Sequence, residues 1–246
     1  MNGQVRVQLQ LLSLVCIAAV ADTGAQGNQW RKCSTDTSTA AIEACTSVIF
    51  LDPANDGAYI NRGIAFRRAG SLDLAIRDYG EAIRLNPGEA DAFNNRGNAY
   101  RDRGQFDLAM RDYDAALRLN PRYAHAYNNR GIIFLERDDP TSAGEDFTRA
   151  IQEDPSYANA FRNRGLARLD LRLFESALSD FDTASRLDPE IGRGAEYALA
   201  LFGRGMSQRG ETAAAQRDIE EAKRLLPNVA QVMADEADES HARGDQ

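Results

Sequence analysis

The chain has 246 residues, of which 43% are hydrophobic and 27% charged, so it has enough apolar content to bury a core. Its formal net charge of −8 makes it a poor ligand for nucleic acid or anionic lipid. The sequence contains no basic run, no metal-ligand spacing and no glycine-rich phosphate loop. We therefore expect a folded protein without nucleic acid partner, metal or other cofactor.

Residues 1–21 have the layout of a secretory signal peptide. Arg6 precedes an apolar run from Leu9 to Val20 that ends in small residues, which predicts cleavage after Ala21 or Ala25. The run is about a dozen residues long where a membrane span needs about 20, so a membrane anchor is the weaker interpretation and no span is expected after processing. Removing residues 1–21 removes one charged residue and takes the net charge from −8 to −9.

Cys16 suggests an alternative interpretation of residues 1–21, the signal peptide of a lipoprotein that is lipid-modified at this cysteine. The residues before it, Leu14 and Val15, are bulky where such sites have small residues. A lipoprotein is therefore the weaker alternative, and we expect a periplasmic or secreted protein.

Residues 27–53 carry Cys33 and Cys45, the only cysteines left after removal of the signal peptide. In an oxidising compartment two such cysteines are typical disulfide partners. Two buried thiols are the alternative. We predict a disulfide that locks the N-terminal edge of the fold.

A repeat of 34 residues follows, with its register marked by prolines at Pro53, Pro87, Pro121, Pro155 and Pro189. In the first repeat Tyr59 and Gly63 share one helical face, Gly70 interrupts the helix, and the apolar spacing resumes until Pro87. The pattern of each repeat therefore predicts two helices. One repeat cannot bury its apolar faces alone, so we expect the repeats to stack.

These columns of aromatic, glycine, alanine and proline residues resemble the tetratricopeptide repeat family, of the bacterial exported type. The resemblance implies an all-α fold, an α-solenoid of stacked antiparallel helix pairs that form a right-handed superhelix. Full repeats are expected at residues 56–89, 90–123, 124–157 and 158–191. Residues 27–53 match only the second helix of a repeat, through Ala41, Val48 and Pro53.

A degenerate fifth repeat is expected at residues 196–229, followed by an acidic C-terminal cap and tail at 230–246. The helical spacing of Val229, Val232 and Met233 predicts a short capping helix. In the fifth repeat the matching columns are Leu199, Gly203, Met206, Ala215, Ile219 and Ala222.

Four arginines recur with an aspartate sixteen residues later. On a helix Arg62 lies about 60° from the column of Tyr59, so its guanidinium would be partly buried and would need a carboxylate. We interpret the pairs as structural, with an anion site made of the arginines as the alternative. The expected pairs are Arg62 with Asp78, Arg96 with Asp112, Arg130 with Asp146, and Arg164 with Asp180.

An asparagine recurs two residues after the aromatic position in all four repeats. Two residues correspond to about 200° on a helix, so these side chains point away from the core of their own repeat. A solvated polar face is one interpretation. Asn is, however, a mediocre helix former, and an amide offers two donors and one acceptor that can pair with an extended peptide of any sequence.

By resemblance, the first helices of tetratricopeptide repeats line a concave groove in which asparagine ladders hold peptide backbones. This implies peptide contacts by Asn61, Asn95, Asn129 and Asn163, with Asn94, Asn98, Asn128 and Arg162 as neighbours. The family's clamp for the carboxylates of chaperone tails needs Lys in a column that here holds Asp91, His125 and Asn159. Capture of such tails is therefore not expected.

We expect no enzymatic activity, since the chain has two histidines and no nucleophile elbow, metal-binding spacing or phosphate loop. The leading prediction is an exported adaptor or scaffold that binds an extended peptide or a partner protein in its groove. The alternative is a structural assembly or oligomerisation factor of an envelope complex that uses its ends or its convex face.

Overall fold

The computed structural model describes residues 30–33, 40–191, 193–209 and 211–235. Within these ranges every regular element is helical and there is no strand. The predicted signal peptide, residues 1–21, lies outside the described residues, as does the tail from residue 236. Among the described helices, none combines the length and the apolar composition needed to cross a bilayer.

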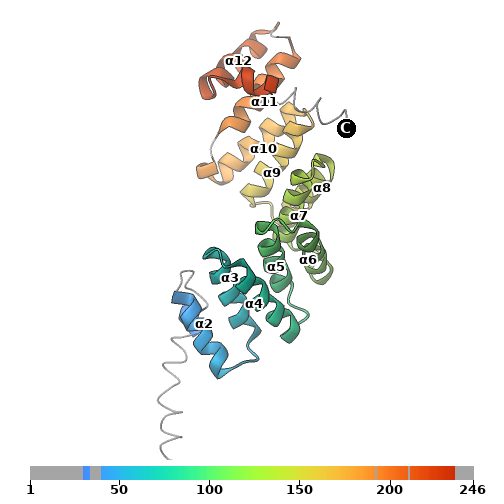
Figure 1. The fold of residues 1–246 in the computed structure, drawn as a ribbon. Coiled ribbons are helices and arrows are strands. Elements are labelled where there is room, and N and C mark those ends of the chain that lie inside the picture. The colour runs from blue at the N-terminus through green and yellow to red at the C-terminus, as the bar shows by residue number, and fades with distance from the viewer. Residues whose placement is uncertain (1–29, 34–39, 192, 210, 236–246) are drawn as a thin grey trace, which may run out of the picture. The chain divides into compact units, whose positions relative to one another are not determined.

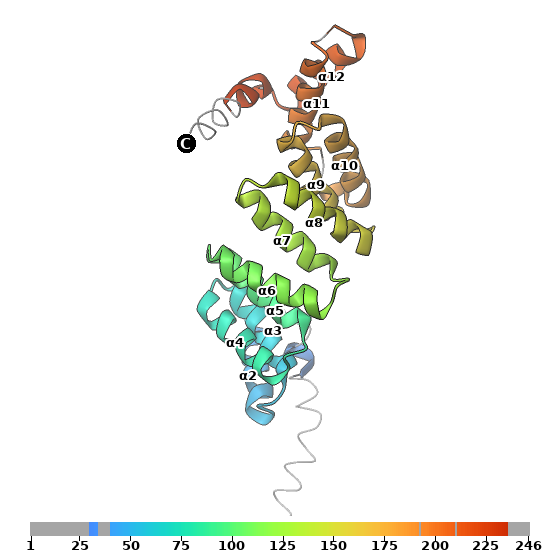
Figure 2. The same cartoon turned by 90° about the vertical axis from the view of Figure 1, so that its right-hand side faces the viewer.

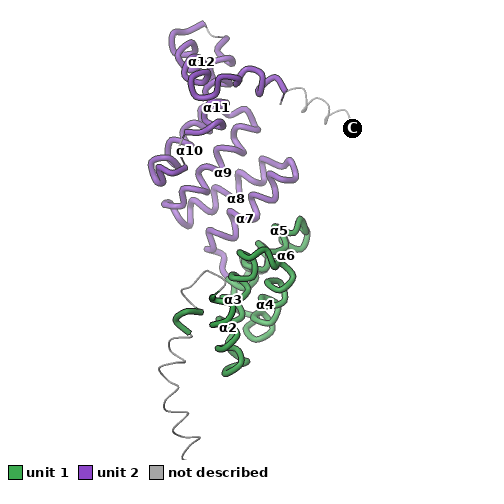
Figure 3. The backbone as a smooth tube through the Cα atoms, turned by 60° about the vertical axis from the view of Figure 1, so that its left-hand side comes forward, with its two compact units in different colours: residues 1–119 green, residues 120–246 purple. Residues whose placement is uncertain are grey.

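The chain divides into two compact units, residues 1–119 and 120–246 (Figure 3). In the first unit each helix packs against the next along the chain (Figure 1). Its helices are α2 (Ala40–Leu51), α3 (Asp56–Arg68), α4 (Leu72–Leu85), α5 (Ala90–Asp102) and α6 (Phe106–Leu119).

The second unit has the same organisation of consecutive helix pairs (Figure 2). Residues 229–235 add a further stretch of helix, and Val229 is fully buried in the core of this unit. The elements are α7 (Ala124–Glu136), α8 (Pro140–Glu153), α9 (Ala158–Asp170), α10 (Phe174–Leu187), η1 (Pro189–Ile191), α11 (Ala195–Ser207) and α12 (Ala213–Leu225).

The 34-residue period of the sequence is the period of the helices. The first helices of the four full repeats begin at residues 56, 90, 124 and 158, and the second helices at 72, 106, 140 and 174. The predicted all-α fold of adjacent helix pairs is therefore confirmed, while the right-handed superhelix stays a prediction.

A glycine in the first helix lets the two helices of each repeat approach closely. A Cβ on Gly63 would lie 2.6 Å from Cε1 of Tyr79, whose ring is fully buried. The same contact joins Gly165 to Phe181, where the distance would also be 2.6 Å. Glycine inside a helix is about 1 kcal/mol less favourable than alanine, and the packing of the aromatic ring against the bare backbone offsets this cost.

Cys33 and Cys45 lie at disulfide distance, with their sulfurs 2.15 Å apart. Both side chains are buried and pack with Ala44, Val48 and Ala58. The pair thus ties residues 30–33 to α2 beside the first full repeat, at the N-terminal end of the described chain.

The register of the fifth repeat differs from the prediction. Gly205, not Gly203, faces the second helix, because a Cβ there would lie 2.7 Å from Cγ1 of Ile219. Ten residues separate Gly205 from Ala215, whereas twelve separate Gly63 and Ala75 in the first repeat. The spacing of the prolines does not reveal this shorter connection, because Pro189 and Pro227 are 38 residues apart where the prolines that mark the other repeats are 34 apart.

The fifth repeat also has an arginine pair, but with a different spacing. Arg204 Nε donates to Asp218 Oδ2 at 2.7 Å, and the two residues are fourteen apart where those of the full repeats are sixteen apart. Met206, expected in a packing column, is 53% exposed.

Candidate functional site

The arginine of each full repeat makes a two-point pair with the aspartate of the second helix. In the first repeat Arg62 Nε donates to Asp78 Oδ2 at 2.7 Å and Nη2 donates to Oδ1 at 2.8 Å. Asp78 is buried, so the pair joins α3 to α4 from inside the repeat. The Nε–Oδ2 distances of the other pairs are 2.8 Å for Arg96 and Asp112, 2.7 Å for Arg130 and Asp146, and 2.9 Å for Arg164 and Asp180.

The surroundings of these arginines argue against the alternative of an anion site. The Arg62 guanidinium lies 5.6 Å from the ring centre of Tyr59 and 5.8 Å from that of Phe66. Its Nη1 donates to Thr46 at 3.1 Å. The hydrogen bond to Asp78 raises the pKa of Arg62 in spite of its burial. The guanidinium therefore already has its carboxylate, its aromatic contacts and its hydroxyl.

The asparagine column is partly exposed in both units. In the first unit Asn61 lies on α3 and Asn95 on α5, two helices in direct contact. Within the described residues neither side-chain amide has a hydrogen-bond partner. Two amides on neighbouring helices are thus available to a ligand.

In the second unit the column is linked to a neighbouring asparagine. Asn163 Nδ2 on α9 donates to Asn128 Oδ1 on α7 at 2.9 Å. Asn129 is partly exposed on α7. The amide of Asn163 therefore keeps its oxygen for a ligand while one of its N–H groups connects two successive repeats.

Several predicted neighbours of the column have other positions than expected. Asn94 and Asn128 are buried, at 5% and 3% exposure, which corrects the expectation that they lie open to a peptide. Asn98 Oδ1 accepts a hydrogen bond from the Tyr113 hydroxyl at 2.8 Å. Arg162 Nη2 donates to Glu196 at 2.7 Å, so its charge is already balanced.

Comparison with known proteins agrees with this geometry. Family models described as "Tetratricopeptide repeat" and "TPR repeat" match residues 94–158 and 65–101. The chain therefore contains tetratricopeptide repeats (TPRs) over residues 65–158. A search of curated protein sequences gave no match.

Several solved structures share the fold of this chain. YrrB, described as a TPR protein with an unusual peptide-binding site, is 21% identical with a TM-score of 0.63, and the match covers 79% of this chain and 99% of YrrB. MamA is 24% identical with a TM-score of 0.52, over 61% of this chain and 82% of MamA. A thermophilic TPR protein from Thermus thermophilus is 18% identical with a TM-score of 0.57, over 66% of this chain and 89% of that protein. At these identities the similarity shows the fold alone.

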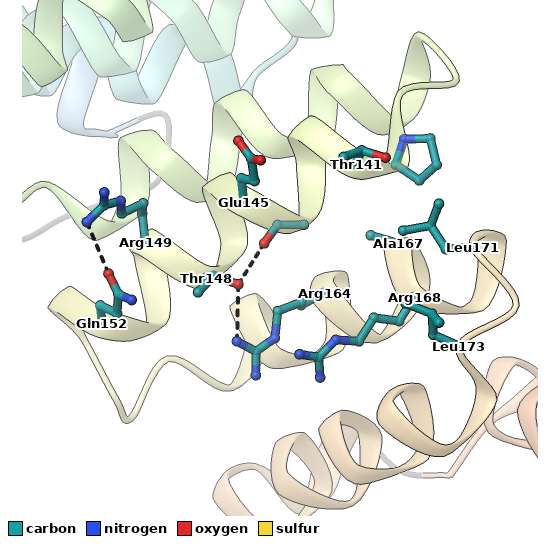
Figure 4. A pocket seen from close by; sticks show the side chains of 12 residues that line it. Thr141, Glu145, Thr148, Arg149, Gln152, Arg164, Ala167, Arg168, Leu171 and Leu173 are labelled. Carbon is teal, nitrogen blue, oxygen red and sulfur yellow. Dashed lines mark hydrogen bonds between the residues drawn. The ribbon is translucent and has the colours of Figure 1, made fainter.

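The TPR structure also contains a pocket that sequence reasoning missed. It lies between α8 and α9 and has a volume of about 510 Å³ (Figure 4). Gly144 and Arg168 line it, and no member of the asparagine column does. The only signal of this location in the sequence is that both residues depart from the type that the other repeats have in the same columns.

Proposed function

We propose that this TPR protein is a non-enzymatic adaptor that binds an extended segment of a partner polypeptide through the asparagine-bearing face of its first helices. The observation that carries the proposal is the pair of unpartnered, partly exposed amides of Asn61 and Asn95 in the first unit. Each can donate to a peptide carbonyl and accept from a peptide N–H. Such contacts hold the main chain and leave the partner's side chains free to vary.

The surroundings support a polypeptide ligand over a small charged one. The arginines next to the column are paired within their own repeats, so the face offers neutral hydrogen-bonding groups. The similar protein YrrB is described as having a peptide-binding site, which is consistent with the proposal. In the second unit Asn129 and Asn163 would make the equivalent contacts.

We further propose that the protein acts in the periplasm or outside the cell. The signal-peptide layout of residues 1–21 supports this, as does the pairing of Cys33 with Cys45, because disulfides persist in oxidising compartments. Mass analysis of the protein isolated from its native cells should find the mature N-terminus after residue 21 or 25 and no free thiol. A retained leader and two free thiols would contradict the assignment.

Peptide binding can be tested with ligands selected from a displayed library of random peptides. Fluorescence polarisation should give an affinity about tenfold weaker for Asn61→Ala/Asn95→Ala, since two amide hydrogen bonds of ordinary strength are lost. Gln216→Ala removes an exposed amide from α12 and serves as the matched control with unchanged affinity.

Thermal melting of the variants separates binding from folding. The double variant should melt as the wild type does, because neither amide has a partner within the described residues. Unchanged affinity in the double variant would reject the asparagine face, and a ligand-dependent change in molecular size would instead favour an assembly role.

A further inference from the structure

One position of α8 departs from the pattern of the other repeats and leaves space unfilled. Gly144 stands where the other repeats have Ile76, Met110 and Leu178. Leu178 is 4% exposed and Ile76 packs against a buried cluster that includes Ala99, so this column normally fills the space beside the next repeat. A Cβ on Gly144 would meet no atom within 4 Å. The third repeat therefore lacks an apolar side chain that is buried in the fourth repeat and partly buried in the first and second.

A second departure places an additional charge at the same location. Arg168 stands where the other repeats have Phe66, Tyr100 and Phe134. Arg168 Nη1 donates to Asp180 Oδ2 at 2.6 Å, although Asp180 is already paired with Arg164. Two guanidinium groups thus share one buried carboxylate. Burial lowers the pKa of Arg168, and the positive charge of Arg164 contributes to this shift.

Both departures line the pocket between α8 and α9. Arg164 and Arg168 enter it from α9, and Thr148 and Glu145 come from α8 (Figure 4). Leu171 and Leu173 at its edge are 41% and 51% exposed. The pocket thus combines unfilled apolar space with the guanidinium of Arg168, which shares its only carboxylate among the described residues with Arg164. This local surplus of positive charge lies in a chain whose formal net charge is −8.

We infer that this pocket docks a segment of a partner polypeptide in which an Asp or Glu is adjacent to a leucine-sized apolar residue. The carboxylate pairs with Arg168, and the apolar side chain occupies the space beside Gly144. Charge complementarity selects the acidic residue, because the second guanidinium on Asp180 gives this pocket a positive surplus that the one-to-one pairs of the other repeats do not have. The site is independent of the asparagine column, none of whose members lines it.

The test uses two blocked tetrapeptides with Glu-Leu or Leu-Glu at the centre, titrated into the full chain and followed by NMR. At least one of them should produce saturable shifts at the backbone amides of Gly144, Arg168 and Leu171. The same peptides with Gln in place of Glu should bind about tenfold more weakly, as expected for the loss of a charge-assisted hydrogen bond.

Substitutions that restore the pattern of the other repeats should close the site. Gly144→Met fills the space and should weaken binding about tenfold, the loss expected when a leucine-sized side chain is no longer buried. It should not weaken folding, since Met is a better helix former than Gly. Arg168→Tyr should weaken binding of the Glu peptides and leave that of the Gln peptides unchanged.

Two further variants test the role of charge. Glu145→Gln removes the acidic side chain that lines the pocket and should strengthen binding. Arg186→Gln removes an exposed arginine outside the pocket and should have no effect. The inference is overturned if neither peptide gives saturable shifts at the pocket, or if Gly144→Met and Arg168→Tyr bind both peptides as the wild type does.

Discussion

The first and second repeats have the same pair of helices, the same glycine–aromatic contact and the same arginine–aspartate pair. They differ in whether the tyrosine hydroxyl has a hydrogen-bond partner. The Tyr113 hydroxyl of the second repeat donates to Asn98 at 2.8 Å. The corresponding residue in the first repeat is Ile64, and the Tyr79 hydroxyl is buried without a hydrogen-bond partner among the described residues. The same glycine–aromatic contact thus accompanies an unsatisfied hydroxyl in the first repeat and a satisfied one in the second.

This difference shows that a repeat protein can vary its polar contacts while the packing of its helices stays the same. The ring of Tyr79 still packs on Gly63 as that of Tyr113 packs on Gly97. The third and fourth repeats have Phe147 and Phe181 at this position, opposite the apolar residues Ile132 and Leu166. The first repeat combines a tyrosine with an apolar neighbour and therefore buries a hydroxyl that nothing satisfies.

The largest effect should come from breaking what the two repeats share. Arg96→Ala removes the partner of Asp112, a carboxylate at 5% exposure, and should lower the free energy of unfolding by about 3 kcal/mol, at the lower end for breaking a buried ion pair because the arginine is 22% exposed. Urea unfolding followed by circular dichroism measures this loss. Arg111→Ala, an exposed arginine on α6, is the control, and equal stability of the two variants would contradict a structural role for the pair.

The next effect should differ in sign between the two repeats. Tyr113→Phe removes a hydroxyl that has a partner and should lower the free energy of unfolding by about 1 kcal/mol. Tyr79→Phe removes an unsatisfied hydroxyl and should leave stability unchanged or raise it by up to about 1 kcal/mol, because the desolvation of the hydroxyl is avoided. Urea unfolding of both variants decides the matter, and a similar loss in both would mean that Tyr79 has a partner.

The comparison also predicts a dependence on alkaline pH. Burial raises the pKa of Tyr79 above its ordinary value. The unfolded chain then releases this proton above about pH 10 while the folded chain keeps it, so stability is fully present below pH 10 and falls as the pH rises, by up to about 1.4 kcal/mol per pH unit. Tyr79→Phe should show a shallower fall between pH 9.5 and about 11 than the wild type. Identical slopes in urea unfolding would count against the shifted pKa.

The smallest effect concerns the turn between the two helices of a repeat. The first two repeats have Gly70 and Gly104 at a φ of 74°, whereas the fourth has Arg172 at a φ of 57°. Left-handed backbone is unfavourable for a side chain by about 1 kcal/mol, so Arg172→Gly should raise the free energy of unfolding by somewhat less than that after the entropy of glycine is subtracted. Gly70→Arg should have the opposite effect, and a rise in melting temperature for Gly70→Arg would contradict the cost assigned to a side chain at this left-handed position.

Much of the fold followed from sequence because it is periodic. Prolines and glycines at fixed spacing set the helix boundaries, and the sixteen-residue separation of Arg62 and Asp78 placed the two residues opposite each other in the repeat. Burial of Asn94 and Asn128 could not be predicted in this way. It depends on how the helix of one repeat covers the helix of another, which the spacing within a single repeat does not determine.

The predicted register of the fifth repeat was wrong for a different reason. Gly203 lies twelve residues before Ala215, which is the spacing of the full repeats and predicts it as the packing glycine. Gly205, only ten residues before Ala215, has that place in the structure. Without aromatic residues in the columns, nothing in the sequence opposed the wrong register. At the pocket, by contrast, the sequence does carry a signal, because Gly144 departs from a column that is apolar and larger in the other repeats.

The central claim, that the amides of the asparagine column bind an extended polypeptide, is tested most directly by the side-chain NH₂ signals of Asn61 and Asn95 in NMR spectra. On addition of a library-selected peptide both pairs of signals should shift with one common saturation curve. The NH₂ signals of Asn86, which donates to Asp56 at 2.8 Å, should stay in place. A peptide that saturates the protein while the signals of Asn61 and Asn95 do not move would contradict the account.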